Sequence, residues 1–190
     1  MTAFPLRIAL FALALAAALP SNGAAAAEAL QRLAEPRTHA ILRHAIAPGT
    51  GDPPGFTLGD CATQRNLDER GRAQARAIGA AFRDAGVKVD RVLTSQWCRS
   101  AETAALLGLG AVSEEPALNS FFADRSSEPE QTAAIRRLLA ALPAEETAVL
   151  VSHQVNITAL TGIYPRSGEV VILRVTPDGA VEAVGRFLAE

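Results

Sequence analysis

Two histidines and two arginines stand where short apolar runs of this chain end. Arg43 and His44 close one such run, Arg99 follows a second and His153 follows a third. Guanidinium groups pair with phosphate oxygens and stay charged at physiological pH, so two arginines can hold a phosphoryl group and neutralise its transition state. A neutral imidazole can attack phosphorus and form a phosphohistidine that water hydrolyses. Nearby arginines would also disfavour protonation of His44. These residue types together predict a phosphoryl-transfer pocket.

Each of these residues alone has an ordinary explanation. An Arg-His pair at a strand end is more often a surface pair, and a histidine before a helix is more often a cap, because short motifs match by chance. The constellation is what points to chemistry. His39 lies on the opposite face of its strand from His44, so we expect it to be structural.

Alternating strands and helices are expected to position the four residues. Apolar runs predict strands, and helical spacing with caps such as Asp68 and Gly86 predicts helices. The expected strands cover 38–44, 89–94 and 147–152, and the expected helices cover 29–33, 68–84, 101–107, 127–142 and 155–160, the fourth of these opening with the capping-box spacing of Ser127 and Glu130. This order predicts a three-layer α/β/α sandwich with a mostly parallel sheet.

The C-terminal part of the chain has a different pattern. Segments 169–175 and 180–187 flank a turn at 177–179, which predicts an antiparallel hairpin at the edge of the sheet. In open α/β sheets, ligands bind beyond the carboxyl ends of the strands. We therefore expect three strand ends to bring both arginines and both histidines to one crevice.

The first 27 residues have the pattern of a secretory signal peptide. Arg7 gives a positive start, residues 8–19 are apolar, and residues 24–27 are small. The apolar run is short for a membrane span. We expect cleavage near Glu28, a domain covering 28–190, and a periplasmic or secreted protein with no stable membrane span after cleavage. A retained N-terminal anchor is the alternative.

Composition bounds the remaining possibilities. With 190 residues, 49% hydrophobic and 20% charged, the chain suits one domain with a sizeable core. Its formal net charge of -2 gives no reason to expect a nucleic acid or an anionic membrane as partner. Oligomeric state has no signature in the sequence.

The two cysteines, Cys61 and Cys98, match no zinc-binding spacing. An exported protein meets an oxidising compartment, where such a pair can form a disulfide. A Cys61–Cys98 bond is therefore a hypothesis, and its alternative is two free thiols.

Four ordered motifs resemble those of the histidine phosphatase superfamily, also called phosphoglycerate-mutase-like. The likeness spans residues 38–162 and is carried by Arg43-His44-Ala45, by segments 66–75 and 92–104, and by segment 149–153 followed by Thr161-Gly162. Alanine replaces the glycine of the usual Arg-His-Gly motif. This variant resembles the branch that contains phosphohistidine phosphatases and exported relatives.

The resemblance implies a phosphoglycerate-mutase-like fold and a role for each motif residue. His44 would accept the phosphoryl group, and Arg43, Arg99 and His153 would complete the phosphate pocket. Arg65 and Asn66, beside Gln64, would contact the substrate. No metal and no organic cofactor is implied.

The chain departs from the family at the general acid. Asn119 and Ser120 stand where many relatives carry a glutamate. Asp124, or alternatively Glu128, is expected to protonate the leaving oxygen. Gln154 follows the second histidine, so the His-Asp pattern of acid phosphatases is absent, and the chain has no room for their large cap domain.

These observations together predict a phosphatase that hydrolyses phosphomonoesters through a phosphohistidine on His44, with a phosphorylated small molecule or inorganic phosphate as its ligand. A mutase is the nearest enzyme rival, and a phosphohistidine-protein phosphatase is an alternative choice of substrate. A non-catalytic phosphate-binding module, or an exported structural protein, would be a different class. The discriminating feature is whether Asp124 or Glu128 reaches the pocket.

Overall fold

The computed structural model of the chain describes residues 22–189. Most of the predicted leader therefore lies outside the described residues. The elements in chain order are α1 (Asn22–Gln31), β1 (Thr38–Arg43), α2 (Glu69–Asp84), β2 (Arg91–Thr94), α3 (Cys98–Leu107), β3 (Val112–Glu114), α4 (Glu128–Ala141), β4 (Ala148–Ser152), α5 (Gln154–Thr161), β5 (Glu169–Val175) and β6 (Val181–Leu188). Short 3-10 turns, η1 (Arg32–Ala34), η2 (Cys61–Thr63), η3 (Pro116–Leu118) and η4 (Arg125–Ser127), connect some of them.

The strands form one mixed sheet in the order β3-β2-β4-β1-β5-β6. β3, β2, β4 and β1 run parallel to one another, whereas β5 is antiparallel to both β1 and β6. The predicted mostly parallel sheet with a C-terminal antiparallel hairpin is confirmed.

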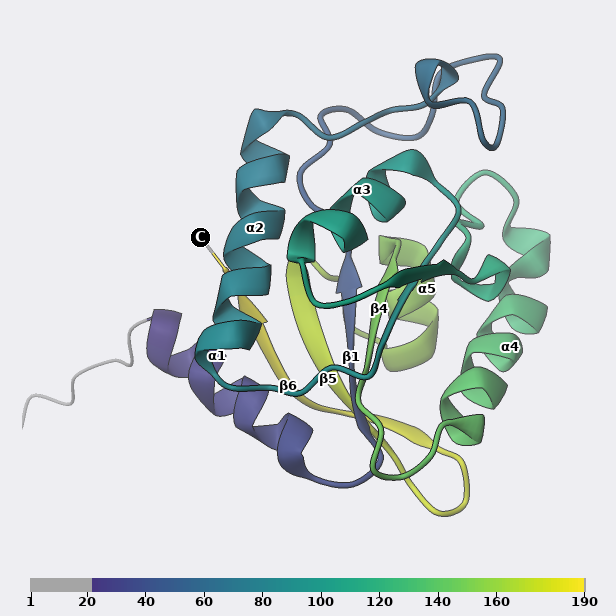
Figure 1. The fold of residues 1–190 in the computed structure, drawn as a ribbon. Helices are drawn as coiled ribbons and strands as arrows, with labels where there is room; N and C mark the ends of the chain where they lie inside the picture. The colour runs from purple at the N-terminus through teal and green to yellow at the C-terminus, as the bar shows by residue number, and fades with distance from the viewer. Residues whose placement is uncertain (1–21, 190) are drawn as a thin grey trace, which may run out of the picture.

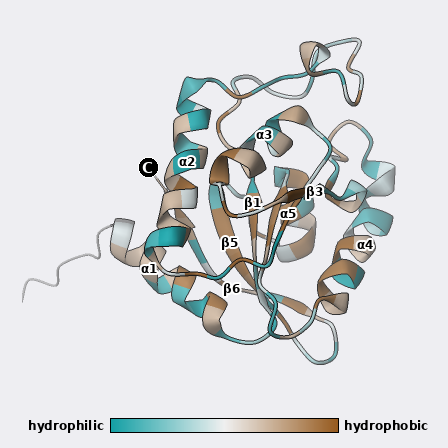
Figure 2. Cartoon of the chain, in the orientation of Figure 1, coloured by the Kyte–Doolittle hydropathy of each residue, from teal (hydrophilic) through white to brown (hydrophobic). Residues whose placement is uncertain are grey.

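Helices cover both faces of the sheet (Figure 1). α1, α2 and α3 pack on one face through a core that includes Leu30, Ile78, Phe82 and Leu107. α4 and α5 pack on the other face through a second core. Figure 2 shows that the strands between these layers are hydrophobic while the helices carry hydrophilic residues on part of their surface. The three-layer α/β/α architecture predicted from the sequence is confirmed.

The structure differs from expectation at α3, which begins at Cys98 rather than near residue 101. The first turn of the helix gains a partner from a distant loop, because the Cys98 amide donates to Gln64 Oε1 at 3.0 Å. Arg99 therefore lies on a helix and not in a loop.

Two further differences have local causes. β3 was not predicted because its three residues are exposed and form no apolar run. The capping box predicted at Ser127 is absent, since the turn η4 places Ser127 in helical backbone geometry and its hydroxyl donates to the Asp124 carbonyl. None of the helices within residues 22–189 is long and apolar enough to cross a membrane.

The carboxyl ends of β1, β2 and β4 lie level with one another. The His44 amide donates to the Ser152 carbonyl at 2.9 Å, and the Ser95 amide donates to the Val151 carbonyl at 3.0 Å. The residues that follow these three strands therefore meet at one edge of the sheet.

Candidate active site

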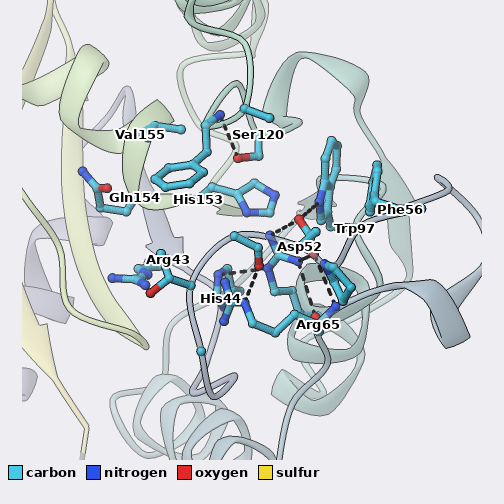
Figure 3. Close-up of a pocket in the computed structure, with 18 of the residues that line it drawn as sticks. Arg43, His44, Asp52, Phe56, Arg65, Trp97, Ser120, His153, Gln154 and Val155 are labelled. Atoms are coloured by element: carbon cyan, nitrogen blue, oxygen red, sulfur yellow. Dashed lines mark hydrogen bonds and ion pairs between the residues drawn. The ribbon is translucent and has the colours of Figure 1, made fainter.

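A cavity of about 530 Å³ opens at this edge. Its floor holds the four residues predicted from the sequence together with Arg65 and Asp52 (Figure 3). The other lining residues are Gly49, Thr50, Gly51, Pro53, Gly55, Phe56, Trp97, Ser120, Phe122, Ala123, Gln154, Val155 and Tyr164. Gln154 and Val155 begin α5, so the amino end of that helix borders the cavity.

His44 is held as a neutral imidazole. Its side chain is 2% exposed, and its Nδ1 lies 2.8 Å from the Ala45 carbonyl oxygen, which can only accept, so Nδ1 carries the proton. Nε2 then has the lone pair and accepts from Arg99 Nε at 3.2 Å. Burial first, and then the Arg99 guanidinium, lower the pKa of His44 well below 6.5. The nitrogen left with a lone pair is therefore the one beside the arginine.

The alanine that replaces the family's glycine is accommodated by packing. Ala45 is fully buried in a small cluster with Ala47, Leu67 and Ala75. Its amide donates to Thr103 Oγ1 at 3.1 Å, and that hydroxyl donates to the Arg99 carbonyl at 2.7 Å. Ala45 thus ties the end of β1 to the first turn of α3.

His153 faces His44 across the floor. The two ring centroids are 5.4 Å apart in an edge-to-face arrangement. His153 Nε2 lies 2.7 Å from Ser95 Oγ, and Ser100 Oγ is 3.4 Å away. Burial, with His44 and Arg99 nearby, lowers the pKa of His153 well below its usual value. Both serines lie within segment 92–104, one of the segments that carry the motif likeness.

Three guanidinium groups make the floor electropositive. Arg99 is 3% exposed. Arg43 donates through one terminal nitrogen to the Pro165 carbonyl at 3.2 Å, while its buried Nε has no acceptor among the described residues. Arg65 donates through Nε to the Gly51 carbonyl at 2.8 Å, and burial together with Arg99 lowers the pKa of Arg65 to about 10. The arrangement suits an anion with several oxygens.

Asp52 is the site residue that sequence analysis missed. Its two carboxylate oxygens accept from the two terminal nitrogens of Arg99 at 2.6 and 3.2 Å, and one also accepts from Trp97 Nε1 at 2.9 Å. Burial acts to raise the pKa of Asp52, but the hydrogen bonds from Arg99 and Trp97 outweigh it, so the pKa is lowered. The signal in the sequence was an acidic residue within the Gly- and Pro-rich loop that follows the Arg-His motif.

The expected general acid is not in the cavity. Asp124 caps η4 by accepting from the Ser126 amide at 3.0 Å, and hydrogen bonds from Ser126 lower the pKa of Asp124. Glu128 begins α4 and pairs with Arg125 at 3.1 Å. Neither lines the cavity, although Ala123 does. Local capping and pairing thus hold both candidate acids outside the cavity.

The two predicted substrate contacts differ in their placement. Arg65 lines the cavity, as expected. The Asn66 side-chain amide instead donates to the carbonyls of Cys61 and Gln64, at 2.7 and 3.1 Å, and lies outside the cavity. Asn66 therefore shapes its own loop, and the structure does not bring it together with the other predicted site residues.

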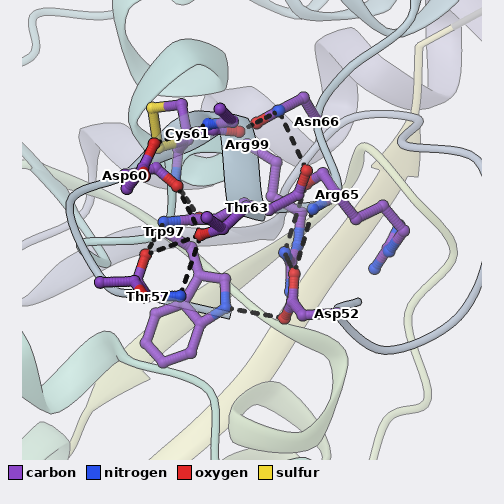
Figure 4. Close-up of a disulfide and its surroundings, with 12 residues drawn as sticks. Asp52, Thr57, Asp60, Cys61, Thr63, Arg65, Asn66, Trp97 and Arg99 are labelled. Carbon is purple, nitrogen blue, oxygen red and sulfur yellow. Dashed lines mark hydrogen bonds and ion pairs between the residues drawn. A yellow bond between two sulfur atoms is a disulfide. The ribbon is translucent and has the colours of Figure 1, made fainter. Parts of the chain in front are cut away.

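A disulfide ties the loop over the cavity to α3. Cys61 and Cys98 are bonded in the structure (Figure 4). Next to the bond, Phe56 stacks on Trp97 with ring centroids 5.1 Å apart. Because Cys98 directly precedes Arg99, the covalent link holds the loop that carries Asp52 and Arg65 close to this arginine.

The lining of the cavity is aromatic as well as charged. Four aromatic side chains, Phe56, Trp97, Phe122 and Tyr164, line the cavity, and two of them are well exposed, Phe122 at 50% and Tyr164 at 73%. The charged side chains of the lining are Arg43, Asp52, Arg65 and Arg99. The cavity thus combines cations that suit an anion with aromatic surface.

No three His, Cys, Asp or Glu side chains within residues 22–189 are grouped so that they could hold a metal ion. The chemistry of the floor is that of arginine, imidazole and one carboxylate.

Comparison with known proteins supports the resemblance seen in the motifs. The family model of the histidine phosphatase superfamily (branch 1) matches residues 59–126, a range that includes Arg99 but neither His44 nor His153. No curated protein matches the chain. The match and the fold together confirm the resemblance to the histidine phosphatase superfamily.

Solved structures share the fold over most of the chain. The protein histidine phosphatase SixA, complexed with tungstate, is 16% identical with a TM-score of 0.58, over 80% of this chain and 96% of that one. A SixA protein from Nakamurella multipartitia is 24% identical with a TM-score of 0.57, over 82% and 96%. A protein of Escherichia coli assigned as an alpha-ribazole-5'-P phosphatase is 16% identical with a TM-score of 0.59, over 80% and 96%. At these identities the likeness establishes the fold.

Proposed function

We propose that this protein is a phosphatase that hydrolyses phosphomonoesters through a phosphohistidine intermediate on His44. The observation that carries the proposal is the state of that imidazole. It is neutral, its Nδ1 is anchored on a carbonyl oxygen, and its Nε2 lies 3.2 Å from a buried guanidinium. A nucleophile beside a fixed cation suits attack on an anionic phosphoryl group.

The other floor residues have roles that follow from their charge and position. Arg43, Arg65 and Arg99 would hold the phosphoryl oxygens and neutralise charge that develops during transfer. His44 Nε2 would attack phosphorus and displace the alcohol. Water would then cleave the phosphorus–nitrogen bond and release phosphate. His153, buried 5.4 Å from His44 between ring centroids, would hydrogen-bond the transferring group.

The aromatic part of the cavity lining favours one kind of phosphomonoester. The side chains of Phe56, Trp97, Phe122 and Tyr164 would bury a flat or apolar leaving group. The SixA structure is a complex with tungstate, an oxyanion shaped like phosphate. A small aryl or similarly flat phosphate is therefore the substrate that we propose.

A second candidate is a phosphohistidine-protein phosphatase. It is favoured by the likeness to SixA proteins and by the position of Asp124 and Glu128 outside the cavity. The same position of these carboxylates also supports a phosphate-binding module with little turnover. Phosphohistidine turnover without ester turnover would favour the first of these, and phosphate binding without any turnover would favour the second.

The test is hydrolysis of 4-nitrophenyl phosphate, with EDTA present, by residues 28–190. We expect activity that survives EDTA, disappears in His44→Ala, and falls by about 10²-fold or more in Arg99→Ala. Arg137→Ala, which removes an exposed arginine of α4, is the matched control and should retain full activity. Equal activity in the wild type and His44→Ala would refute the mechanism.

A further inference from the structure

The Asp52–Arg99 pair occupies the part of the floor that a phosphoryl group needs. Arg99 donates a hydrogen bond from Nε to His44 Nε2. Its two terminal nitrogens, the pair of donors that matches two phosphate oxygens, both donate to the Asp52 carboxylate. The carboxylate is thus bound where phosphoryl oxygens would bind. Figure 3 shows Asp52 pointing into the cavity between Trp97 and Arg65.

A dianionic phosphoryl group and an ionised Asp52 cannot both bind the two terminal nitrogens of Arg99. Two like charges within a few ångströms in a partly buried site repel strongly, and the usual result is that one of them takes up a proton. The other charged or titratable groups of the cavity lining are Arg43, Arg65, Arg99, His44, His153 and Tyr164. Both imidazoles are buried among cations, so Asp52 is the group that gains most from becoming neutral.

We propose that the substrate's phosphoryl group displaces Asp52 from Arg99, that Asp52 takes up a proton as this happens, and that it then gives this proton to the leaving oxygen. This inference rests on the proposed function. It supplies the general acid that Asp124 and Glu128 are not placed to supply, since Asp52 is the one carboxylate among the cavity residues of the described chain.

The steps balance without a further reactant. His44 Nε2 forms a bond to phosphorus, the bond from phosphorus to the leaving oxygen breaks, and that oxygen takes the Asp52 proton, which gives an alcohol and an Asp52 carboxylate. Water then attacks phosphorus, its proton passes to Asp52, and the bond electrons return to Nε2. As phosphate leaves, Asp52 returns to the solvent the proton that the solvent supplied on substrate binding, and it pairs with Arg99 again.

Binding of an inert oxyanion separates this role from a purely positioning one. Tungstate, a dianion across pH 6–8, is the probe, and calorimetry in buffers of different ionisation heat counts the protons taken up. The wild type should take up about one proton and bind tungstate about tenfold more tightly for each pH unit lowered. Asp52→Asn should take up no proton, bind tungstate with little dependence on pH, and bind tungstate more tightly than the wild type does at pH 8.

Asp60→Asn is the matched control. Asp60 caps η2 in the same loop, and asparagine caps equally well, so tungstate binding should not change.

Turnover then tests the transfer of the proton. In single-turnover measurements, Asp52→Asn should form the phosphoenzyme from 4-nitrophenyl phosphate, whose leaving group needs no proton, at nearly the wild-type rate, and should lose about 10²- to 10⁴-fold in the rate of phosphoenzyme formation from phenyl and alkyl phosphates. Weaker tungstate binding in Asp52→Asn, or pH-independent binding in the wild type, would show that Asp52 only positions Arg99 and would overturn the inference. Equal losses for all leaving groups would overturn the acid role as well. A wild type that binds no tungstate would instead refute the phosphate pocket, and with it the proposed function.

Discussion

Three buried histidines of this chain show how surroundings set the behaviour of one residue type. His39 accepts from the Ala148 amide at 3.3 Å between two strands, and burial lowers its pKa to about 4, as suits a structural residue. His44 and His153 are as deeply buried but lie among guanidinium groups at a cavity. Burial alone therefore does not distinguish the proposed nucleophile, His44, whereas its anchored Nδ1 and the neighbouring arginine do.

The lowered pKa of His44 has a consequence for the pH dependence of activity. The nucleophile must be neutral, and its pKa in the folded protein is well below 6.5, so the neutral form is complete at pH 6.5 and is lost only as pH falls through the lowered value. We expect kcat for 4-nitrophenyl phosphate to stay high at pH 6 and to decline at lower pH. A pH–rate profile with its acidic inflection at 6.5 or above would contradict this assignment.

At the scale of elements, α2 is pressed closely against the two segments that carry the site. A Cβ at Gly71 would lie 2.0 Å from the Ile46 carbonyl oxygen, just after the Arg-His motif, and a Cβ at Gly79 would lie 1.9 Å from the Leu107 carbonyl oxygen at the end of α3. Backbone atoms cannot move aside cheaply, so both positions require glycine despite its low helix propensity.

Alanine at these two glycines should separate stability from activity. Each substitution is expected to lower the free energy of unfolding by about 1–3 kcal/mol, because strain outweighs the gain in helix propensity. Gly71→Ala should also reduce activity, since it displaces the segment that follows His44, while the folded fraction of Gly79→Ala should keep its kcat. Denaturant unfolding and steady-state assays measure both effects. Ala73→Gly, at an exposed position of the same helix, is the control for helix propensity alone.

The loop between β1 and α2 depends on a covalent link as well as on packing. The Cys61–Cys98 bond joins residues with a sequence separation of 37, and a constraint of this length on the unfolded chain is worth about 3–4 kcal/mol. The double variant Cys61→Ser/Cys98→Ser should lose stability of this order and raise KM, because Arg65 and Asp52 are held near Arg99 through the linked segments. Unchanged stability and KM would show that packing of Phe56 on Trp97 suffices.

At the scale of the whole molecule, the predicted leader meets the fold inside α1. Cleavage before Glu28 would cut the helix Asn22–Gln31, removing Ala26 from the core but leaving Ala29, Leu30 and Leu33. The loss amounts to one small apolar side chain, and the sheet with its other helices is untouched.

We propose that the protein is exported and processed at this point. Expression with the leader in a bacterial host should give a periplasmic or secreted protein that begins near Glu28, as read by mass spectrometry. Residues 28–190 should fold with a free energy of unfolding within about 1 kcal/mol of that of residues 22–190. A chain that retains Met1 and stays with the membrane would support an N-terminal anchor instead.

Local patterns in the sequence were enough to predict the sheet apart from β3, most of the helices and four residues of the cavity floor. Apolar runs and helical spacing are local patterns, and residues that follow parallel strands must meet at one edge of the sheet. The clustering of Arg43, His44, Arg99 and His153 could therefore be predicted from the sequence. The motif likeness to the histidine phosphatase superfamily rests on the same ordered strand ends.

Which carboxylate enters the cavity depended on the tertiary structure alone. Asp124 looked suitable by its place in the chain, yet it is used in capping a turn, whereas Asp52 in a loop of glycines and prolines reaches Arg99. A loop follows no period, and its path is set by contacts between residues distant in sequence, here the Cys61–Cys98 bond and the Gln64 contact with α3. The chemistry of the strand ends could therefore be predicted from local patterns, while the partner of Arg99 depended on long-range contacts that no local pattern encodes.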